Sequence, residues 1–124
     1  MKVLIAGATG AIGRQLVRCL KQNHTVFALV RSPESSRAVA TLDAEPIAAG
    51  VFDAASVKAV IARVRPDAVI NELTSLPRHY TPAEMSAAAE RDRLPVEAFA
   101  GHRDEVTLRV ARSGKQDEGL VVRE

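Results

Sequence analysis

The feature that most constrains this chain is a set of three glycines placed directly after a short apolar segment. Residues 2–6 read Lys-Val-Leu-Ile-Ala, and residues 7–13 read Gly-Ala-Thr-Gly-Ala-Ile-Gly. A continuous apolar run that stops at glycine is typical of a central parallel strand covered on both faces. The apolar residues that follow recur at helical spacing, at Ile12, Leu16, Val17 and Leu20. The sequence therefore predicts a strand, a tight turn and an amphipathic helix.

The same alternation continues along the chain. We predict strands over residues 25–30, 46–50 and 67–71, because these runs are apolar and too short for buried helices. Ser32-Pro33 and Asp53 are helix-start signals, and the second helix runs to about Leu42 while Arg65-Pro66 ends the third. Since parallel crossovers are right-handed, this order predicts an α/β fold, the N-terminal half of a Rossmann-type doubly wound parallel sheet.

The C-terminal part follows a different pattern. Residues 82–93 carry Ala, Glu and Met at helical density and predict a helix that Pro95 stops. In place of an apolar fifth strand, residues 105–112 alternate between apolar and polar, and residues 119–122 form a second short β-like run. We therefore predict a domain over residues 1–93 and a C-terminal segment, residues 94–124, that is irregular or hairpin-like.

The glycine turn has the features of a pyrophosphate site. Gly7 permits a sharp turn, Gly10 leaves room for phosphate, and Gly13 lets the helix pack closely on the strand. The first amides of the helix have no intrahelical partner and lie at the positive end of its dipole. The predicted dinucleotide-binding residues of this turn are Gly7, Thr9, Gly10, Ala11, Ile12 and Gly13. The alternative is a tight turn without a ligand; a Walker phosphate loop is excluded because Arg14 follows the last glycine.

The end of the second predicted strand bears on the choice of cofactor. NAD-binding proteins usually place a carboxylate there to hold the ribose hydroxyls, whereas this chain has Arg31-Ser32. A guanidinium and a hydroxyl suit the 2′-phosphate of NADP, and Arg37 could add a second cation. The sequence therefore favours NADP over NAD. The alternatives are a solvated Arg31 and a Ser32 that only caps the helix, although capping is compatible with phosphate contact.

Composition excludes several other function classes. The formal charge of +2 and the scarcity of aromatic side chains, with Tyr80 and three Phe, argue against nucleic acid. No apolar run approaches the roughly 18 residues that a membrane span needs, and no signal peptide opens the chain, so we expect no membrane contact and a cytoplasmic protein. The histidines His24, His79 and His102 lack metal-ligand spacing. Cys19 is expected to be a buried structural thiol, and residues 90–93 a solvated helix face.

Three segments of this chain resemble the corresponding segments of a known family. They are residues 2–14, Leu-Val-Arg-Ser at residues 29–32 and Pro-Asp-Ala-Val-Ile-Asn at residues 66–71. The chain resembles the extended and atypical short-chain dehydrogenase/reductase superfamily, particularly NAD-dependent epimerase/dehydratase-like proteins, over residues 1–93. The resemblance implies that the glycine turn binds NAD or NADP. It also implies that Leu73 and Thr74 line the cofactor channel.

Two departures from that family bear on function. The family's aspartate after the third strand, which contacts adenine, is replaced here by Gly50 or Val51, since Asp53 is better interpreted as a helix N-cap. The family's catalytic Tyr-x-x-x-Lys pattern is missing, because Tyr80 is followed four positions later by Glu84. We therefore expect a truncated family member that holds cofactor without catalysing by itself. The alternatives are an NADP-sensing regulatory module and a subunit that completes its site with another copy or a partner chain.

Overall fold

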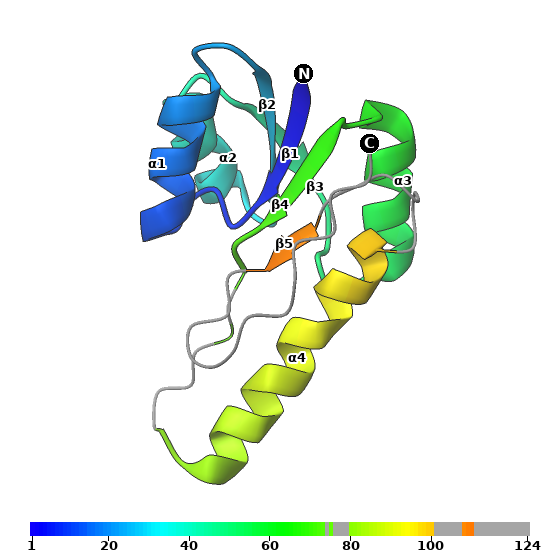
Figure 1. The fold of residues 1–124 in the computed structure, drawn as a ribbon. Helices are drawn as coiled ribbons and strands as arrows, with labels where there is room; N and C mark the ends of the chain where they lie inside the picture. Colours follow the sequence, from blue (N-terminus) through cyan, green and yellow to red (C-terminus); the bar gives the residue numbers. More distant parts are fainter. Residues whose placement is uncertain (74, 76–79, 101–107, 111–124) are drawn as a thin grey trace.

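The computed structural model describes residues 1–73, 75, 80–100 and 108–110 (Figure 1). Its strands are β1 (Lys2–Ala6), β2 (Thr25–Val30), β3 (Glu45–Ala48), β4 (Ala68–Asn71) and β5 (Leu108–Val110). Its helices are α1 (Ala11–Leu20), α2 (Pro33–Ala40), α3 (Ala54–Val64) and α4 (Pro82–Ala100). Within this described part, the strands form one parallel sheet in the order β3-β2-β1-β4-β5. The predicted α/β doubly wound sheet is confirmed.

The two faces of the sheet bury separate cores, because alternate residues of β1 point to opposite sides. Val3 and Ile5 pack with Val17 of α1 and Val39 of α2. On the other face, the second core joins residues of the sheet strands to the apolar stripe of α3. It includes Leu4, Ala6, Val57, Val60, Ile61, Val64 and Val69. Burying each large aliphatic side chain contributes about 1.5–3 kcal/mol, so these cores hold the strand ends in register. At the carboxyl edge, Ala6 lies opposite both Leu29 and Asn71.

Local signals set the helix boundaries as the sequence predicts. The Ser32 hydroxyl accepts a hydrogen bond from the Ser35 amide at 3.1 Å, and the Asp53 carboxylate accepts one from the Ala55 amide at 3.0 Å. Both residues are therefore N-caps, each satisfying an amide that the helix leaves unpaired. Helix α3 ends where Arg65 adopts a left-handed conformation with φ of 50°, just before Pro66. The Asp53 interpretation is confirmed.

The structure corrects the prediction for the C-terminal part in two respects. Helix α4 does not stop at Pro95 but continues to Ala100. Strand β5 pairs in parallel with β4, which continues the Rossmann order by one more strand. Contacts of α4 with α3, β4 and β5 outweigh the local penalty of a proline, about 3 kcal/mol in a helix interior. Residues 119–122, the other half of the suggested hairpin, lie outside the described residues.

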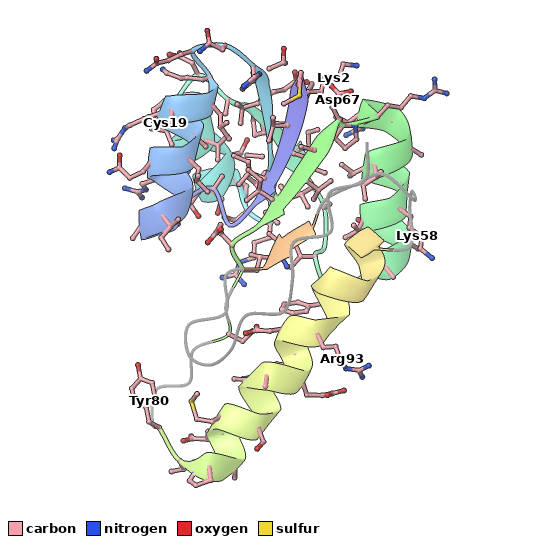
Figure 2. All side chains as sticks on the ribbon, viewed as in Figure 1. Lys2, Cys19, Lys58, Asp67, Tyr80 and Arg93 are labelled. Carbon is pink, nitrogen blue, oxygen red and sulfur yellow. The ribbon has the colours of Figure 1, made fainter. Side chains whose placement is uncertain are left out.

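The expectation of a buried thiol is wrong. Cys19 is exposed on the outer side of α1, as Figure 2 shows. It follows the buried Val17 by two positions, and two residues turn an α-helix by about 200°, so the two side chains face opposite ways. Near the end of the same helix, Lys21 forms an ion pair with Asp43 at 2.6 Å, which ties α1 to the turn before β3.

Candidate functional site

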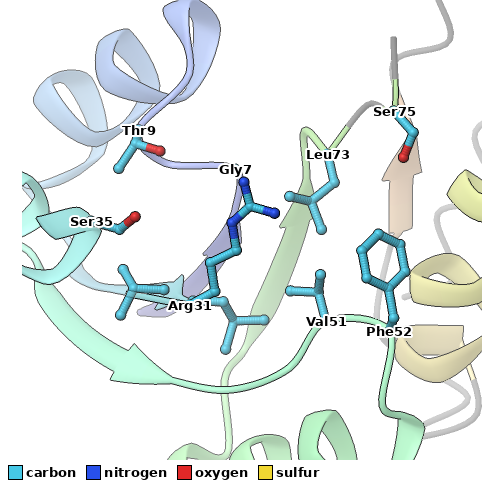
Figure 3. A pocket seen from close by; sticks show the side chains of 10 residues that line it. Gly7, Thr9, Arg31, Ser35, Val51, Phe52, Leu73 and Ser75 are labelled. Carbon is cyan, nitrogen blue, oxygen red and sulfur yellow. The ribbon is translucent and has the colours of Figure 1, made fainter. Parts of the chain in front are cut away.

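A cleft of about 200 Å³ lies at the carboxyl edge of the sheet, where β1, β2, β3 and β4 end (Figure 3). This is the edge at which doubly wound sheets bind their ligands, in the crevice outside the carboxyl ends of the strands where the strand order reverses. The residues that line the cleft are Gly7, Thr9, Leu29, Val30, Arg31, Ser35, Val51, Phe52, Leu73 and Ser75. The cleft therefore brings together four of the residues predicted for the site, namely Gly7, Thr9, Arg31 and Leu73.

The glycine turn has the geometry that the sequence predicts. Gly7 has φ of +88°, which L side chains rarely adopt, and a Cβ there would also lie 2.8 Å from the backbone of Glu72. A Cβ on Gly13 would lie 2.1 Å from the Gly7 carbonyl oxygen. The Gly10 amide donates to that same carbonyl oxygen at 3.0 Å. Glycine is therefore required at positions 7 and 13 for the chain to pass so closely over the end of β1.

The N-terminus of α1 differs from those of α2 and α3 because it has no side-chain cap. Its N-cap residue is Gly10, and its first turn contains no acidic residue. Helix geometry leaves the amides of Ala11, Ile12 and Gly13 without intrahelical acceptors. The preceding loop is held in place by Arg14, whose Nε donates to the Thr9 carbonyl oxygen at 2.9 Å. These amides and the helix dipole form a cradle suited to the oxygens of a phosphate group.

The end of β2 contributes the cation of the cleft. Arg31 is exposed, and its guanidinium extends across the cleft toward Gly7 (Figure 3). Ser35, which the sequence interpretation missed, also lines the cleft, and its hydroxyl lies 2.9 Å from the Ser32 hydroxyl. Ser32 itself caps α2 and is not a lining residue, and Arg37 is exposed outside the lining set. The sequence signal that could have identified Ser35 is its hydroxyl in the first turn of α2, three residues after the predicted cap Ser32.

The ends of β3 and β4 form the opposite wall. Val51 and Phe52 follow β3, and Phe52 leaves 53% of its surface exposed at the cleft. After β4, the buried Asn71 accepts a hydrogen bond from the Leu73 amide at 3.2 Å. Ser75 completes this wall, whereas Thr74, predicted beside Leu73, lies outside the described residues. The described residues of this wall are therefore mostly apolar, and Ser75 adds a hydroxyl.

Residues 90–93 are not a purely solvated face. The half-buried Asp92 accepts a hydrogen bond from the Ser75 amide at 2.7 Å, so it touches the segment that lines the cleft. The neighbouring pair does match the expectation, because Arg93 and the exposed Glu90 form an ion pair at 2.5 Å. The hydrogen bond from Arg93 and its positive charge lower the pKa of Glu90. Periodicity could not distinguish Asp92 from its charged neighbours.

Arg31 is the charged side chain among the residues described as lining the cleft, and no carboxylate joins it there. Over the same described ranges, no group of three or more potential metal-ligating side chains comes together. Among the helices that the structure describes, none is long and apolar enough to cross a membrane. The described lining of the cleft thus combines the Arg31 cation, the hydroxyls of Thr9, Ser35 and Ser75, and an apolar wall.

The NAD dependent epimerase/dehydratase family has a sequence model that matches residues 3–88, more than half of the chain. The chain belongs to this family. The match runs from β1 into α4, so it includes the glycine turn, Arg31 and both walls of the cleft. Membership implies a nicotinamide dinucleotide cofactor, and the uncapped α1 with its close glycine packing fits the pyrophosphate of such a cofactor.

A curated protein with a similar sequence is the 3-diazoavenalumate denitrifying reductase of a Streptomyces species. It is 37% identical over 105 residues, which cover 81% of this chain and 32% of the relative. The chain thus spans about a third of the length of that relative.

Solved structures of epimerases share the fold. The UDP-Glc/GlcNAc 4-epimerase of Campylobacter jejuni is 23% identical, with a TM-score of 0.64 over 79% of this chain and 32% of that chain. The UDP-glucose 4-epimerase of Bifidobacterium longum, solved with NAD+ and UDP, is 16% identical, with a TM-score of 0.67 over 87% of this chain and 36% of that chain. At these identities the likeness establishes the fold.

Proposed function

We propose that this chain binds NADP in preference to NAD in the cleft at the carboxyl edge of its sheet. The observation that carries the proposal is the Arg31 guanidinium, which extends across a cleft whose described lining contains no carboxylate. A carboxylate at the end of β2 would repel the 2′-phosphate of NADP, whereas a guanidinium attracts it.

The remaining parts of the cofactor follow from the order of the strands. The pyrophosphate rests on the amides of Ala11, Ile12 and Gly13, because these are the unpaired donors nearest the glycine turn. The adenosine ribose and its 2′-phosphate lie beside Arg31 and Ser35, with Arg37 as a second cation at longer range. Thr9 lies beside the phosphates, and Leu73 and Thr74 bound the channel on the β4 side.

The adenine ring packs on the apolar wall after β3. Val51 and Phe52 offer aliphatic and aromatic surface there, and Gly50 offers no side chain. The ring is therefore held by burial of its faces rather than by a carboxylate that accepts from its amino group. The contact buries apolar surface of Phe52, whose side chain is more than half exposed without it.

We further propose that the chain by itself does not catalyse hydride transfer or epimerisation. Its one tyrosine, Tyr80, has Glu84 rather than lysine four positions later. Tyr80 is 74% exposed and lies beside the start of α4, away from the sheet (Figure 2). The chain therefore lacks, at the spacing of the Tyr-x-x-x-Lys pattern, the lysine that would act with this tyrosine in acid/base catalysis.

Calorimetric titration of the full chain with NADPH and NADH side by side tests the proposal. A charge-assisted hydrogen bond contributes about 1.5–3 kcal/mol, so NADPH should bind roughly tenfold more tightly, or somewhat more. Binding of NADH with equal or higher affinity would remove the NADP preference while keeping the dinucleotide site. Absence of heat with either cofactor, checked by fluorescence of the reduced nicotinamide, would contradict the whole proposal.

A further inference from the structure

The segment after β4 leaves the sheet and is then held by side chains. The Glu72 amide makes the final ladder contact, donating to the Ala6 carbonyl oxygen at 2.9 Å. The next described amides find side-chain acceptors: Leu73 donates to Asn71 at 3.2 Å, and Ser75 donates to Asp92 at 2.7 Å. Asn71 is only two residues from Leu73, whereas Asp92 comes from a different element, 17 residues along the chain.

The face of α4 that bears Asp92 is turned toward the rest of the protein. Among the α4 side chains that the structure describes, Ala88 is buried and Glu84 and Asp92 are half-buried, while their neighbours are exposed. These three residues are spaced by four, which places them on one side of the helix. Of these three side chains, Ala88 is apolar and the other two carry carboxylates that can accept hydrogen bonds. Asp92 uses its carboxylate for a specific contact, the hydrogen bond from the Ser75 amide.

We propose that Asp92 is a positioning residue that holds the segment after β4 as one wall of the cleft, so that Leu73 and Ser75 face the cofactor. The inference rests on the proposed function, since it assumes that the cleft takes a dinucleotide. The carboxylate acts through the Ser75 amide, and a bond with an ionised acceptor is roughly twice as strong as a neutral one. Without this acceptor, the half-buried amide loses its partner and the wall loses its anchor.

The experiment compares three variants of the full chain by NADPH titration and thermal unfolding. Asp92→Ala should raise the dissociation constant about tenfold, because a charge-assisted contact orders the wall. Asp92→Asn should stay within about threefold of the parent, because its amide oxygen still accepts from Ser75, without the ionic contribution. Glu84→Ala is the matched control: it removes a half-buried carboxylate from the same face of α4 whose contact is local, with Thr81. It should lower thermal stability without changing NADPH affinity.

Amide hydrogen exchange without cofactor provides a second readout that does not depend on binding. The Ser75 amide should be protected in the parent and in Asp92→Asn, and should lose that protection in Asp92→Ala, whereas Glu84→Ala should leave it unchanged. Three results would each overturn the proposal. The first is parent-like affinity in Asp92→Ala, and the second is an affinity in Asp92→Asn as weak as in Asp92→Ala. The third is an unprotected Ser75 amide in the parent. If the parent fails to bind NADPH while Ser75 protection follows Asp92, the proposed function fails and the anchoring contact stands.

Discussion

A Cβ atom on Gly13 would lie 2.1 Å from the carbonyl oxygen of Gly7, and 2.7 Å from the Cα of Ala8. The first turn of α1 therefore touches the backbone of the preceding loop directly. This contact sets how closely α1 crosses the end of β1. The turn therefore fixes the packing of α1 on β1, and it is also the proposed phosphate site.

Gly13→Ala should destabilise the fold. Overpacking a closely packed contact costs about 1–3 kcal/mol, and here the obstructing atoms belong to the backbone, which has little freedom to move. Chemical denaturation should show a lower midpoint with an unchanged slope. Gly50→Ala is the matched control, because its Cβ would meet only Asp53 at 3.6 Å, an ordinary contact. Equal midpoints for the two variants would contradict the close packing.

Gly10→Val should abolish dinucleotide binding while leaving a folded domain. A Cβ at this position meets the Gly7 carbonyl oxygen at 3.3 Å, which small adjustments can relieve, but the branched side chain then occupies the space in front of the α1 amides. Circular dichroism should match the parent, and calorimetry should detect no NADPH binding. Retention of parent affinity would mean that the turn is purely structural.

Arg31→Asp should reverse the cofactor preference. The new carboxylate would repel the 2′-phosphate of NADPH and could accept from the free ribose hydroxyls of NADH. Because Arg31 is exposed, raised salt should also weaken NADPH binding to the parent more than NADH binding. Dissociation constants for both cofactors at two salt concentrations measure both effects. Equal affinities that the substitution leaves unaltered would mean that Arg31 only contacts solvent.

The chain should show no dehydrogenase or epimerase turnover, since Tyr80 has no lysine in register. Nicotinamide absorbance followed with candidate alcohols and ketones, and product analysis with nucleotide sugars, should both remain at background. Turnover that depends on Tyr80, and is lost in Tyr80→Phe, would contradict this expectation.

The ion pair between Lys21 and Asp43 should make a small pH-dependent contribution to stability. The hydrogen bond from Lys21, and then its charge, lower the pKa of Asp43 below the ordinary value of 3.8. A carboxylate whose pKa is depressed by folding stabilises the protein above its unfolded pKa, and loses this effect as the pH falls through the folded pKa. Thermal unfolding of the parent and Asp43→Asn should therefore differ slightly near neutral pH and converge in acid. Asn suits the test because residue 43 has φ of 57°, which Asn tolerates. A difference that grows in acid would contradict the assignment.

The local sequence determined the first four strands, the helices between them and the helix caps. Short apolar runs bounded by turn residues favour strands over helices, and Ser32 and Asp53 satisfy amides within their own helices. The sequence also predicted the tight turn at Gly7 and the close packing at Gly13, because a glycine between a buried strand and a helix has few other structural uses. The residues that give each of these signals lie close together in the sequence.

Tertiary structure decided the features that depend on partners distant in the sequence. Pro95 lies inside α4, and Leu108–Val110 form β5, because packing against the sheet and α3 outweighs local preference. Asp92 looks like its exposed neighbours in the sequence, and only the fold brings it to Ser75. Ser35 and Phe52 become cleft residues because separate strands end at the same edge. Local preferences contribute at most a few kcal/mol per residue, so the burial and hydrogen bonding of distant segments override them wherever the two conflict.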